Sequence, residues 1–362
     1  MKRFGSNSFL CTHERIALLF VLVVLMFAGT LSAAERAAVG AIRWDAWSGC
    51  EWVTVQVEQT LGPKKFRDRL PWFAEVIDDY SVRINEDTQE ILNREIRFAA
   101  EAGLDYWAFL LYPEEAGMSR AIRRYLDSEI RDQLNFCVIL HNNIGVGSDA
   151  WQRERDRVIA LLREPGYQKT PCGRPIVYLF QANIERFQDL REAIAREGLN
   201  PYYVYLGWNS PADYRRVSPQ GFDAVSAYAA SAQQVATFAE LVQDTENRWR
   251  QAAEANTRYI PLVSTGWDKQ PRKENPVSWE LDHDYHQQES FPSQAKPSEI
   301  AEHLARAIEF VNANPVVCEA NAILIYAWNE FDEGGWLAPT WQENGEPDTS
   351  RLDAIRAVLR EN

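Results

Sequence analysis

Short apolar runs alternate with amphipathic stretches from Ala38 onward, and this pattern predicts eight β-strands. Most of these runs are almost continuously apolar, as expected for parallel strands that are buried on both faces. The predicted strands are 39–47, 104–111, 136–141, 175–180, 202–208, 222–228, 259–265 and 322–328.

Helical periodicity fills the intervals between these strands. The clearest apolar faces are Leu92, Ile96, Ala99 and Ala100, ended by Gly103, and Ile300, Leu304, Ile308 and Val311. A last helix is predicted over 350–360, after the eighth strand. Eight β/α repeats that end in a helix predict a single-domain (β/α)8 TIM barrel, with a doubly wound parallel sheet as the alternative.

Two connections, 50–86 and 268–297, are longer than a barrel requires. They follow the first and the seventh predicted strands, so both leave the carboxyl ends of strands, where barrel enzymes form their active sites. We expect them to wall a cleft, and the alternative is that they are ordinary surface insertions.

The first 34 residues predict an export signal. Lys2, Arg3 and Arg15 precede an apolar run over 16–31, and small residues at 32–34 form a cleavage site. Cleavage after Ala34 would leave a catalytic domain over 35–362 in a secreted or periplasmic protein. The alternative is an uncleaved anchor, because the run approaches the length that spans a bilayer.

The chain of 362 residues carries a formal net charge of −14, which becomes −16 when Lys2, Arg3, Arg15 and Glu14 are removed. Such a surface repels nucleic acid and anionic lipid, so neither a nucleic-acid partner nor stable membrane association after signal cleavage is expected. Four cysteines would remain, and we expect mostly free thiols, because Cys137 lies within a predicted strand.

Two glutamates, Glu330 and Glu333, follow the eighth predicted strand within the segment YAWNEFDEGGW (326–336). Cleavage of a glycosidic bond requires one protonated and one ionised carboxyl group, commonly beside aromatic rings that stack on sugars. Strand alternation would place Glu330 on the same side as Tyr326 and Trp328. The alternative is a turn whose acids cap backbone N–H groups.

Aromatic and polar residues at the ends of other predicted strands are candidates for substrate binding. Indole rings stack on sugar faces, and polar side chains bind hydroxyl groups. The candidates are Trp44, Asp45, Trp47, Tyr112, His141, Asn142, Trp208, Tyr228, Trp267, Asp268, Arg272, Trp328, Asn329 and Trp336. The alternatives are core packing for the tryptophans, and a salt bridge between Asp268 and Arg272.

Other chemistries lack sequence support. The chain has no G-x-S-x-G elbow, no H-E-x-x-H helix and no glycine-rich phosphate loop. His283 and His286 lie three residues apart, but on a polar loop without a thiolate, so neither a metal site nor another cofactor is expected. The expected partner is a polysaccharide or glycan substrate.

Several sequence blocks resemble glycoside hydrolase family 99 and its WbsX-type relatives. The most specific is NEFDEG (329–334) followed by Leu337, Ala338 and Pro339, which resembles the N-E-W-x-E-G-x-x-(L/I)-E-P signature. Further blocks occur in the same order as in those relatives: RLP (69–71), TQ (88–89), AGLDYW (102–107), GWD (266–268) and PR (271–272).

This resemblance implies a (β/α)8 barrel that cleaves α-mannosidic linkages within chains, with retention. It further implies that Glu330 is the base acting on the substrate 2-hydroxyl, through an anhydro-sugar intermediate, and that Glu333 is the acid/base. The sequence departs from the family at Phe331, which replaces a tryptophan, and at Ala338, which replaces a glutamate. The alternatives are a non-catalytic carbohydrate-binding barrel and a glycosyltransferase, as some WbsX-type relatives have been labelled.

Overall fold

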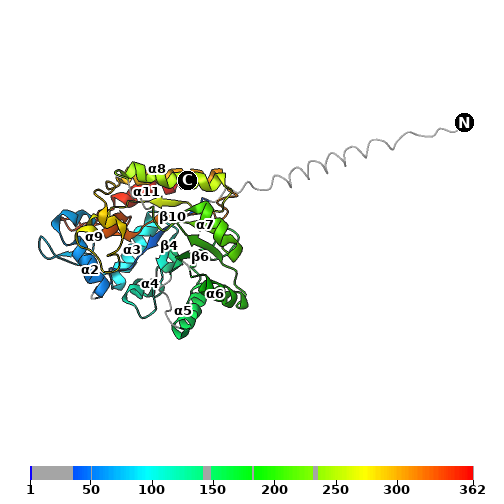
Figure 1. Ribbon diagram of the computed structural model, residues 1–362, viewed down its shortest axis with the longest axis horizontal. Coiled ribbons are helices and arrows are strands. Elements are labelled where there is room, and N and C mark those ends of the chain that lie inside the picture. The colour runs from blue at the N-terminus through cyan, green and yellow to red at the C-terminus, as the bar shows by residue number, and fades with distance from the viewer. Residues whose placement is uncertain (2–35, 50, 142–147, 182, 231–234, 362) are drawn as a thin grey trace. The chain divides into compact units, whose positions relative to one another are not determined.

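In the computed structural model, eight parallel strands form one sheet at the centre of the unit that spans Ala37–Asn362 (Figure 1). The strands are β1 (Ala38–Arg43), β4 (Tyr106–Leu110), β5 (Asn135–His141), β6 (Ile176–Phe180), β7 (Tyr202–Leu206), β8 (Ala224–Ser226), β9 (Leu262–Ser264) and β10 (Ala322–Tyr326). All eight predicted strands are therefore present.

The sheet closes into a barrel. Its hydrogen-bonded order is β8-β7-β6-β5-β4-β1-β10-β9, with every pairing parallel. The two outer strands meet where Val225 forms a parallel bridge with Tyr259, just before β9, and the Ile260 N–H donates to the Val225 carbonyl at 3.1 Å. The predicted (β/α)8 TIM barrel is confirmed.

The structure describes Met1 and residues 36–49, 51–141, 148–181, 183–230 and 235–361. Apart from Met1, the predicted export segment therefore lies outside the described residues, as do Cys50 and Asn142. In the described part of the chain, no helix is both long enough and apolar enough to cross a bilayer.

The strands are buried on both faces, as their apolar sequences predict. Every residue of β4 and β10 is buried, and Tyr106 and Tyr178 join their hydroxyl groups at 3.0 Å inside the barrel. Gly40 in β1 makes room for this packing, because a Cβ atom there would lie 2.2 Å from the Tyr106 ring. Cys137 and Cys318 are buried free thiols and Cys172 is an exposed one, which fits the expectation of mostly free cysteines.

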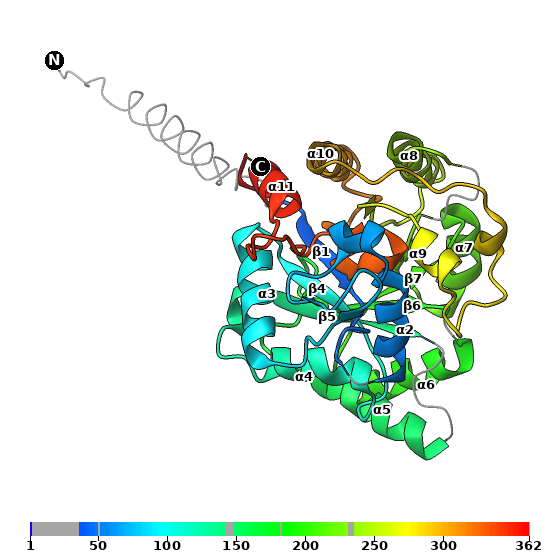
Figure 2. The same cartoon turned by 90° about the vertical axis from the view of Figure 1, so that its left-hand side faces the viewer.

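Helices surround the barrel (Figure 2). The predicted apolar face of α3 is buried at Leu92, Ile96 and Ala99, and Thr88 caps this helix by accepting the Ile91 N–H. The longer helices are α2 (Trp52–Leu61), α3 (Gln89–Glu101), α4 (Arg120–Leu126), α5 (Ser148–Leu161), α6 (Ile184–Arg196), α7 (Ser210–Val217), α8 (Phe238–Glu254), α10 (Pro297–Ala313) and α11 (Ser350–Glu361). The last of these confirms the predicted terminal helix.

The two long connections fold against each other at the carboxyl ends of the strands. The first contains α2, a 3-10 helix (Lys64–Arg69) and a small hairpin of β2 (Glu75–Val76) and β3 (Val82–Arg83). The second, the 268–297 insertion, contains the short helix α9 (Gln270–Glu274) and a 3-10 helix (Asp284–Gln287). Helices α2 and α9 are in contact, and the Ser278 N–H donates to the Gln56 side chain at 2.6 Å.

Candidate active site

The segment after β10 turns sharply and presents two glutamates. Asn329–Glu330 (β11) pairs antiparallel with Gly335–Trp336 (β12), and a 3-10 turn, Phe331–Glu333, lies between them. Gly334 closes the turn with φ +80°, a left-handed conformation that favours glycine. A Cβ atom there would lie 2.5 Å from the Asp268 nitrogen, so this glycine also lets the turn approach the 268–297 insertion.

Glu330 is buried, and only one of its two carboxyl oxygens accepts a hydrogen bond from the part of the chain that the structure describes. The Tyr228 hydroxyl donates to its Oε1 at 2.8 Å, whereas Oε2 has no hydrogen-bond partner among the described residues. The closest cation, Arg272 Nη2, is 4.0 Å from Oε2. Burial, together with the negative charge of Glu333, raises the pKa of Glu330 well above that of an ordinary glutamate.

Glu333 is held by three donors. Arg272 and Lys269 pair with its Oε1, the latter at 2.9 Å, and the Tyr326 hydroxyl donates to its Oε2. Two cations and a hydroxyl donor stabilise the ionised form of a carboxylate. The two glutamates therefore have unequal surroundings, one facing charged donors and the other not.

Arg272 joins several carboxylates in this cluster. Its Nε and Nη2 donate to the two oxygens of Asp332 at 2.7 and 3.0 Å, and its Nη1 donates to Glu280 at 3.0 Å as well as to Glu333. Burial alone would lower the pKa of Arg272, but the surrounding carboxylates outweigh it, and the pKa lies well above its usual value. The guanidinium therefore stays charged although it is buried.

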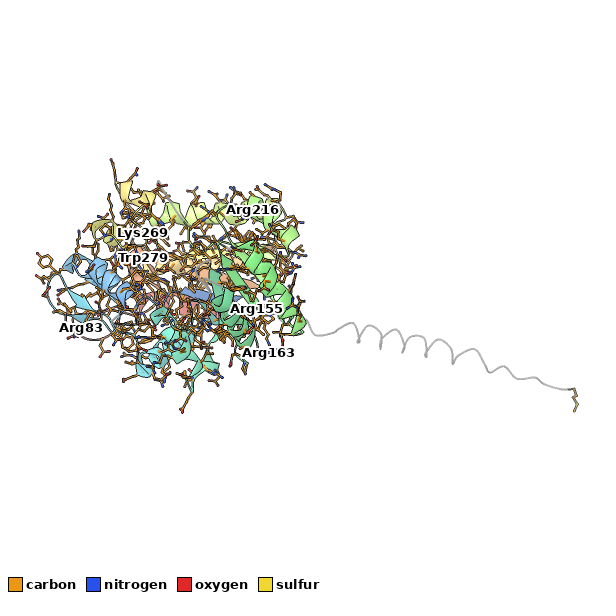
Figure 3. The ribbon with its side chains drawn as sticks, turned by 60° about the horizontal axis from the view of Figure 1, so that its bottom comes forward. Arg83, Arg155, Arg163, Arg216, Lys269 and Trp279 are labelled. Atoms are coloured by element: carbon orange, nitrogen blue, oxygen red, sulfur yellow. The ribbon has the colours of Figure 1, made fainter. Side chains whose placement is uncertain are left out.

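Glu280 links the two cations. Its Oε1 accepts from Lys269 at 2.9 Å, and its Oε2 accepts from Arg272 and from the Tyr285 hydroxyl, each at 3.0 Å. Burial acts to raise the pKa of Glu280, but Arg272 and Lys269 outweigh it and lower the pKa to about 2. Lys269, Arg272, Glu280 and Tyr285 all come from the 268–297 insertion, and Figure 3 labels Lys269 and, from the same insertion, Trp279.

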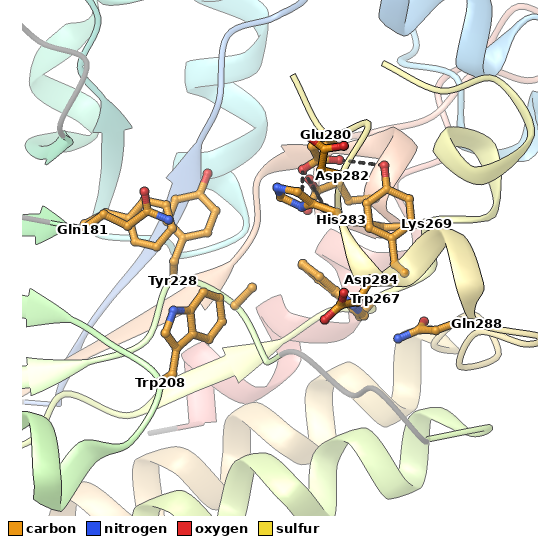
Figure 4. A pocket seen from close by; sticks show the side chains of 14 residues that line it. Gln181, Trp208, Tyr228, Trp267, Lys269, Glu280, Asp282, His283, Asp284 and Gln288 are labelled. Carbon is orange, nitrogen blue, oxygen red and sulfur yellow. Dashed lines mark hydrogen bonds and ion pairs between the residues drawn. The ribbon is translucent and has the colours of Figure 1, made fainter. Parts of the chain in front are cut away.

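Two neighbouring cavities meet at the glutamates. The larger, of about 500 Å³, is lined by Phe180, Gln181, Trp208, Tyr228, Ala229, Trp267, Lys269, Glu280, Asp282, His283, Asp284, Tyr285, Gln288 and Glu333. In Figure 4, Tyr228 and Trp208 stand on one side of it, and Trp267 and Lys269 on the other.

The smaller cavity, of about 210 Å³, is lined by both glutamates. Its other lining residues are Trp44, Leu110, Tyr112, His141, Phe180, Gln181, Tyr228, Arg272, Trp279 and Glu280. Glu333 lines both cavities, whereas Glu330 lines only the smaller one. A ligand spanning both would place the junction between its two parts beside the carboxyl pair.

Seven of the predicted substrate-binding residues line these cavities. They are Trp44, Tyr112, His141, Trp208, Tyr228, Trp267 and Arg272. The Trp44 indole N–H donates to the Tyr112 hydroxyl at 2.9 Å, which fixes both side chains. Burial lowers the pKa of His141 to about 4, so its imidazole is neutral at pH 7.

Six other residues predicted to bind substrate line neither cavity. Asp45 pairs with Arg43 at 2.8 Å, Trp47 packs against Trp44 and Phe331, and Trp336 lies under the Arg351 guanidinium. The Asn329 side-chain oxygen accepts the Trp44 backbone N–H at 2.8 Å, so Asn329 positions a residue that lines the smaller cavity. The remaining two are Asp268 and Trp328.

Asp268 pairs with Arg69 rather than with Arg272, so the proposed salt bridge between Asp268 and Arg272 is wrong. Arg272 turns inward because three carboxylates meet it there. Asp268 instead ties the 268–297 insertion to the first long connection, through its backbone carbonyl as well as its side chain.

Trp328 is buried against Trp107, with ring centres 5.1 Å apart, and it lines neither cavity, so it does not share a side with Glu330 as strand alternation predicted. The strand alternation behind that expectation fails because β10 ends at Tyr326 and the chain then turns. Tyr326 does reach the site, but its hydroxyl contacts Glu333 instead of Glu330.

Four important residues were missed by the sequence analysis: Lys269, Trp279, Glu280 and Tyr285. All lie in the 268–297 insertion, whose unusual length was the only sequence signal for them. The prediction that this insertion walls a cleft is confirmed, whereas the first connection contributes no lining residue.

The described residues contain no cluster of three or more histidine, cysteine, aspartate or glutamate side chains that could hold a metal ion. His286, one of the two loop histidines, contacts the Glu280 backbone carbonyl at 2.8 Å through its ring nitrogen. His283 is mostly exposed at the edge of the larger cavity.

Comparison with solved structures finds a similar fold in an enzyme of known activity. The GH99 endo-α-mannosidase from Bacteroides thetaiotaomicron, in complex with BIS-TRIS-propane, aligns with a TM-score of 0.57 and 14% identity, covering 90% of this chain and 96% of that one. A second structure of that enzyme aligns with the same TM-score and 13% identity, covering 90% and 97%.

No protein-family model matches the chain, and no curated protein sequence is similar to it. The structural likeness supports a barrel like that of glycoside hydrolase family 99, and it does not support the more specific WbsX-type relationship. At this low identity, what the chain shares with the endo-α-mannosidase is its fold, a (β/α)8 barrel.

Proposed function

We propose that this protein is an exported glycoside hydrolase, acting on a neutral glycan of the α-mannoside type, with Glu330 and Glu333 as its catalytic pair. One observation carries the proposal. A buried carboxyl group with an unoccupied oxygen faces the same cavity as a second carboxylate held by two cations, at the carboxyl end of a barrel.

The electrostatics support different protonation states for the two glutamates. Burial raises the pKa of Glu330 and so favours its protonated form, and its Oε2 is available to donate that proton to a ligand in the smaller cavity. Glu333 pairs with the cations Arg272 and Lys269, which favour a negative charge on its carboxyl group. A neutral acid beside a fixed anion is the arrangement that glycosidic bond cleavage uses.

We therefore assign Glu330 as the acid that protonates the leaving oxygen, and Glu333 as the anion that faces the positive charge developing on the sugar. These are the reverse of the roles that the resemblance to family 99 implies. The reversal follows from this chain's own contacts, since both oxygens of Glu333 already accept hydrogen bonds or ion pairs, whereas one oxygen of Glu330 does not.

The cavity walls suit uncharged sugars. Trp208, Trp267 and Tyr228 offer aromatic surfaces to the apolar faces of sugar rings. Asp282, Asp284, Glu280 and Glu333 outnumber Lys269 among the charged residues of the larger cavity, so a sulfated or uronic acid substrate would meet repulsion there. An endo-α-mannosidase with the same fold supports an α-mannoside as the first substrate to test.

The test compares the mature protein with the Glu330→Gln and Glu333→Gln variants on yeast α-mannan, with products followed by chromatography. Each variant should lose at least about a hundredfold in turnover, a typical contribution of general acid-base catalysis. Unchanged turnover in either variant would remove that residue from the catalytic pair. Binding of mannan without any product from the wild type would identify a carbohydrate-binding barrel instead.

An aryl α-mannoside with a good leaving group separates the two roles. Such a group departs with little help from an acid, so Glu330→Gln should retain much more activity on it than on mannan. Glu333→Gln should be impaired on both substrates, because no leaving group replaces the anion. The opposite pattern would restore the roles implied by the family resemblance.

A further inference from the structure

The thirteen tryptophans of the chain all lie within the described residues, and two of them are unusually exposed. Trp52 is 62% exposed and Trp208 is 48% exposed, whereas the other eleven are buried or half-buried. Indole is a large apolar surface that proteins usually cover, so an exposed ring with a fixed position is a candidate for ligand contact.

One exposed indole lines a cavity described above, and the other contacts a residue that does. Trp208 lines the larger cavity. Trp52 contacts Trp279 with ring centres 5.7 Å apart, and Trp279 contacts Trp44 with ring centres 6.2 Å apart. Because Trp279 and Trp44 line the smaller cavity, a row of three indoles leads from the wall beside Glu330 out to solvent.

Trp52 is held in place by its element. It is the first residue of α2, and its ring meets Trp279 at 78°, an edge contact that leaves much of the indole uncovered. One turn further along the helix, the Gln56 side chain accepts the Ser278 N–H at 2.6 Å, which fixes α2 to the segment that carries Trp279. The exposed ring is therefore presented by a rigid support.

We propose that Trp52 forms an outer binding platform for a sugar ring of the same glycan chain that occupies the two cavities. The inference rests on the proposed function and extends it, because it requires a glycan longer than the cavities hold. The occupant is an uncharged sugar whose apolar C–H face stacks on the indole. Trp52 takes no part in bond cleavage, and its contribution is to the affinity for long chains.

A purely structural role makes a different prediction. If Trp52 only braced Trp279, its removal would disturb the smaller cavity and weaken ligands of every length. A platform outside the cavities affects only ligands long enough to reach it. Chain-length dependence is therefore the readout that separates the two roles.

The experiment measures binding by calorimetry in a Glu330→Gln background, which leaves the ligand intact and keeps the ion pairs of Glu333. The probes are yeast α-mannan and the oligosaccharides that partial acid hydrolysis releases from it, separated by length. Trp52→Ala, Trp52→Phe and Tyr80→Ala are compared in that background. Tyr80 is the matched control, because it is 82% exposed but lines neither cavity.

Trp52→Ala should weaken binding of the longest oligosaccharides and of mannan roughly five- to tenfold, in line with the loss of one stacked tryptophan, and leave the shortest bound ones unchanged. Trp52→Phe should retain most of the affinity, and Tyr80→Ala all of it. Equal loss at every length, or no loss at any length, would overturn the platform. If the parent protein binds none of these glycans, the α-mannoside substrate itself is overturned, and the platform with it.

Discussion

Replacing Arg272 by methionine tests the charge cluster that underlies the proposed site. The guanidinium donates two hydrogen bonds to Asp332, pairs with Glu333 and Glu280, and is fully buried. Methionine has a similar length and fits a buried space, but it carries no charge. The variant therefore leaves buried carboxylates without their shared cation.

The expected cost is large because the carboxylates stay buried. Breaking a buried ion pair by removing one partner typically costs about 3–5 kcal/mol in the free energy of unfolding. With an unfolding entropy of roughly 0.7 kcal/mol/K for a domain of this size, that loss corresponds to a fall in Tm of about 4–7 °C near neutral pH.

The cost should depend on pH. Without Arg272, the folded-state pKa of Asp332, which burial already raises, rises further above that of the unfolded chain, so the folded variant binds extra protons. A group with a raised folded pKa contributes stability at low pH that is lost as pH rises. The stability difference between wild type and variant should therefore be greatest at pH 7–8 and shrink toward about pH 4, the ordinary carboxyl range.

Calorimetric unfolding of both proteins across this pH range measures the effect. Arg163→Met is the matched control, because the Arg163–Glu197 pair is about half exposed and such pairs contribute roughly 0–1 kcal/mol. A fall in Tm no larger than that of the control, or one independent of pH, would refute the assigned role of Arg272.

Three further predictions follow from the same contacts. Because the pKa of Glu330 is raised in the folded state, its burial costs stability as pH rises above about 4.3. Glu330→Gln should therefore raise Tm at pH 8 and leave it unchanged at pH 4. Equal Tm values for the variant and the wild type at pH 8 would contradict this prediction. The pKa of Glu280 is lowered to about 2, so its ionised form stabilises the fold and the effect of pH has the opposite sign. Glu280→Gln should lower the free energy of unfolding by about 2–3 kcal/mol at pH 7, and urea unfolding should show this difference fading as pH falls toward 2. A difference that stays constant with pH would contradict this prediction. Among Cys137, Cys172 and Cys318, only the exposed Cys172 should react quickly with a thiol reagent in the native protein, as mass spectrometry of labelled peptides can check; rapid labelling of Cys137 would show that β5 is not buried.

The barrel was predictable because each strand is an apolar run of suitable length between amphipathic stretches. The residues at which the strands end were harder to predict. The first strand ends at Arg43 and the last at Tyr326, both earlier than predicted, because the apolar residues that follow pack in turns instead of continuing the ladder. Side-chain direction after those ends could not be read from alternation, as Trp328 shows.

The catalytic candidates were predictable from their composition and position, but their partners were not. Lys269 and Arg272 meet Glu333 only because two separate turns approach closely at Gly266 and Gly334, where a Cβ atom at Gly266 would lie 2.0 Å from the Gly334 carbonyl oxygen. Such pairings join residues about sixty positions apart, and no local pattern specifies them.

Difference infrared spectroscopy tests the unequal protonation of Glu330 and Glu333 most directly. At pH 7, subtracting the spectrum of the Glu330→Gln variant from that of the wild type should reveal the C=O stretching band of a neutral carboxyl group, and subtracting that of Glu333→Gln should reveal the bands of an ionised carboxylate. An ionised carboxylate lost from Glu330→Gln, with no neutral carboxyl band, would contradict the account.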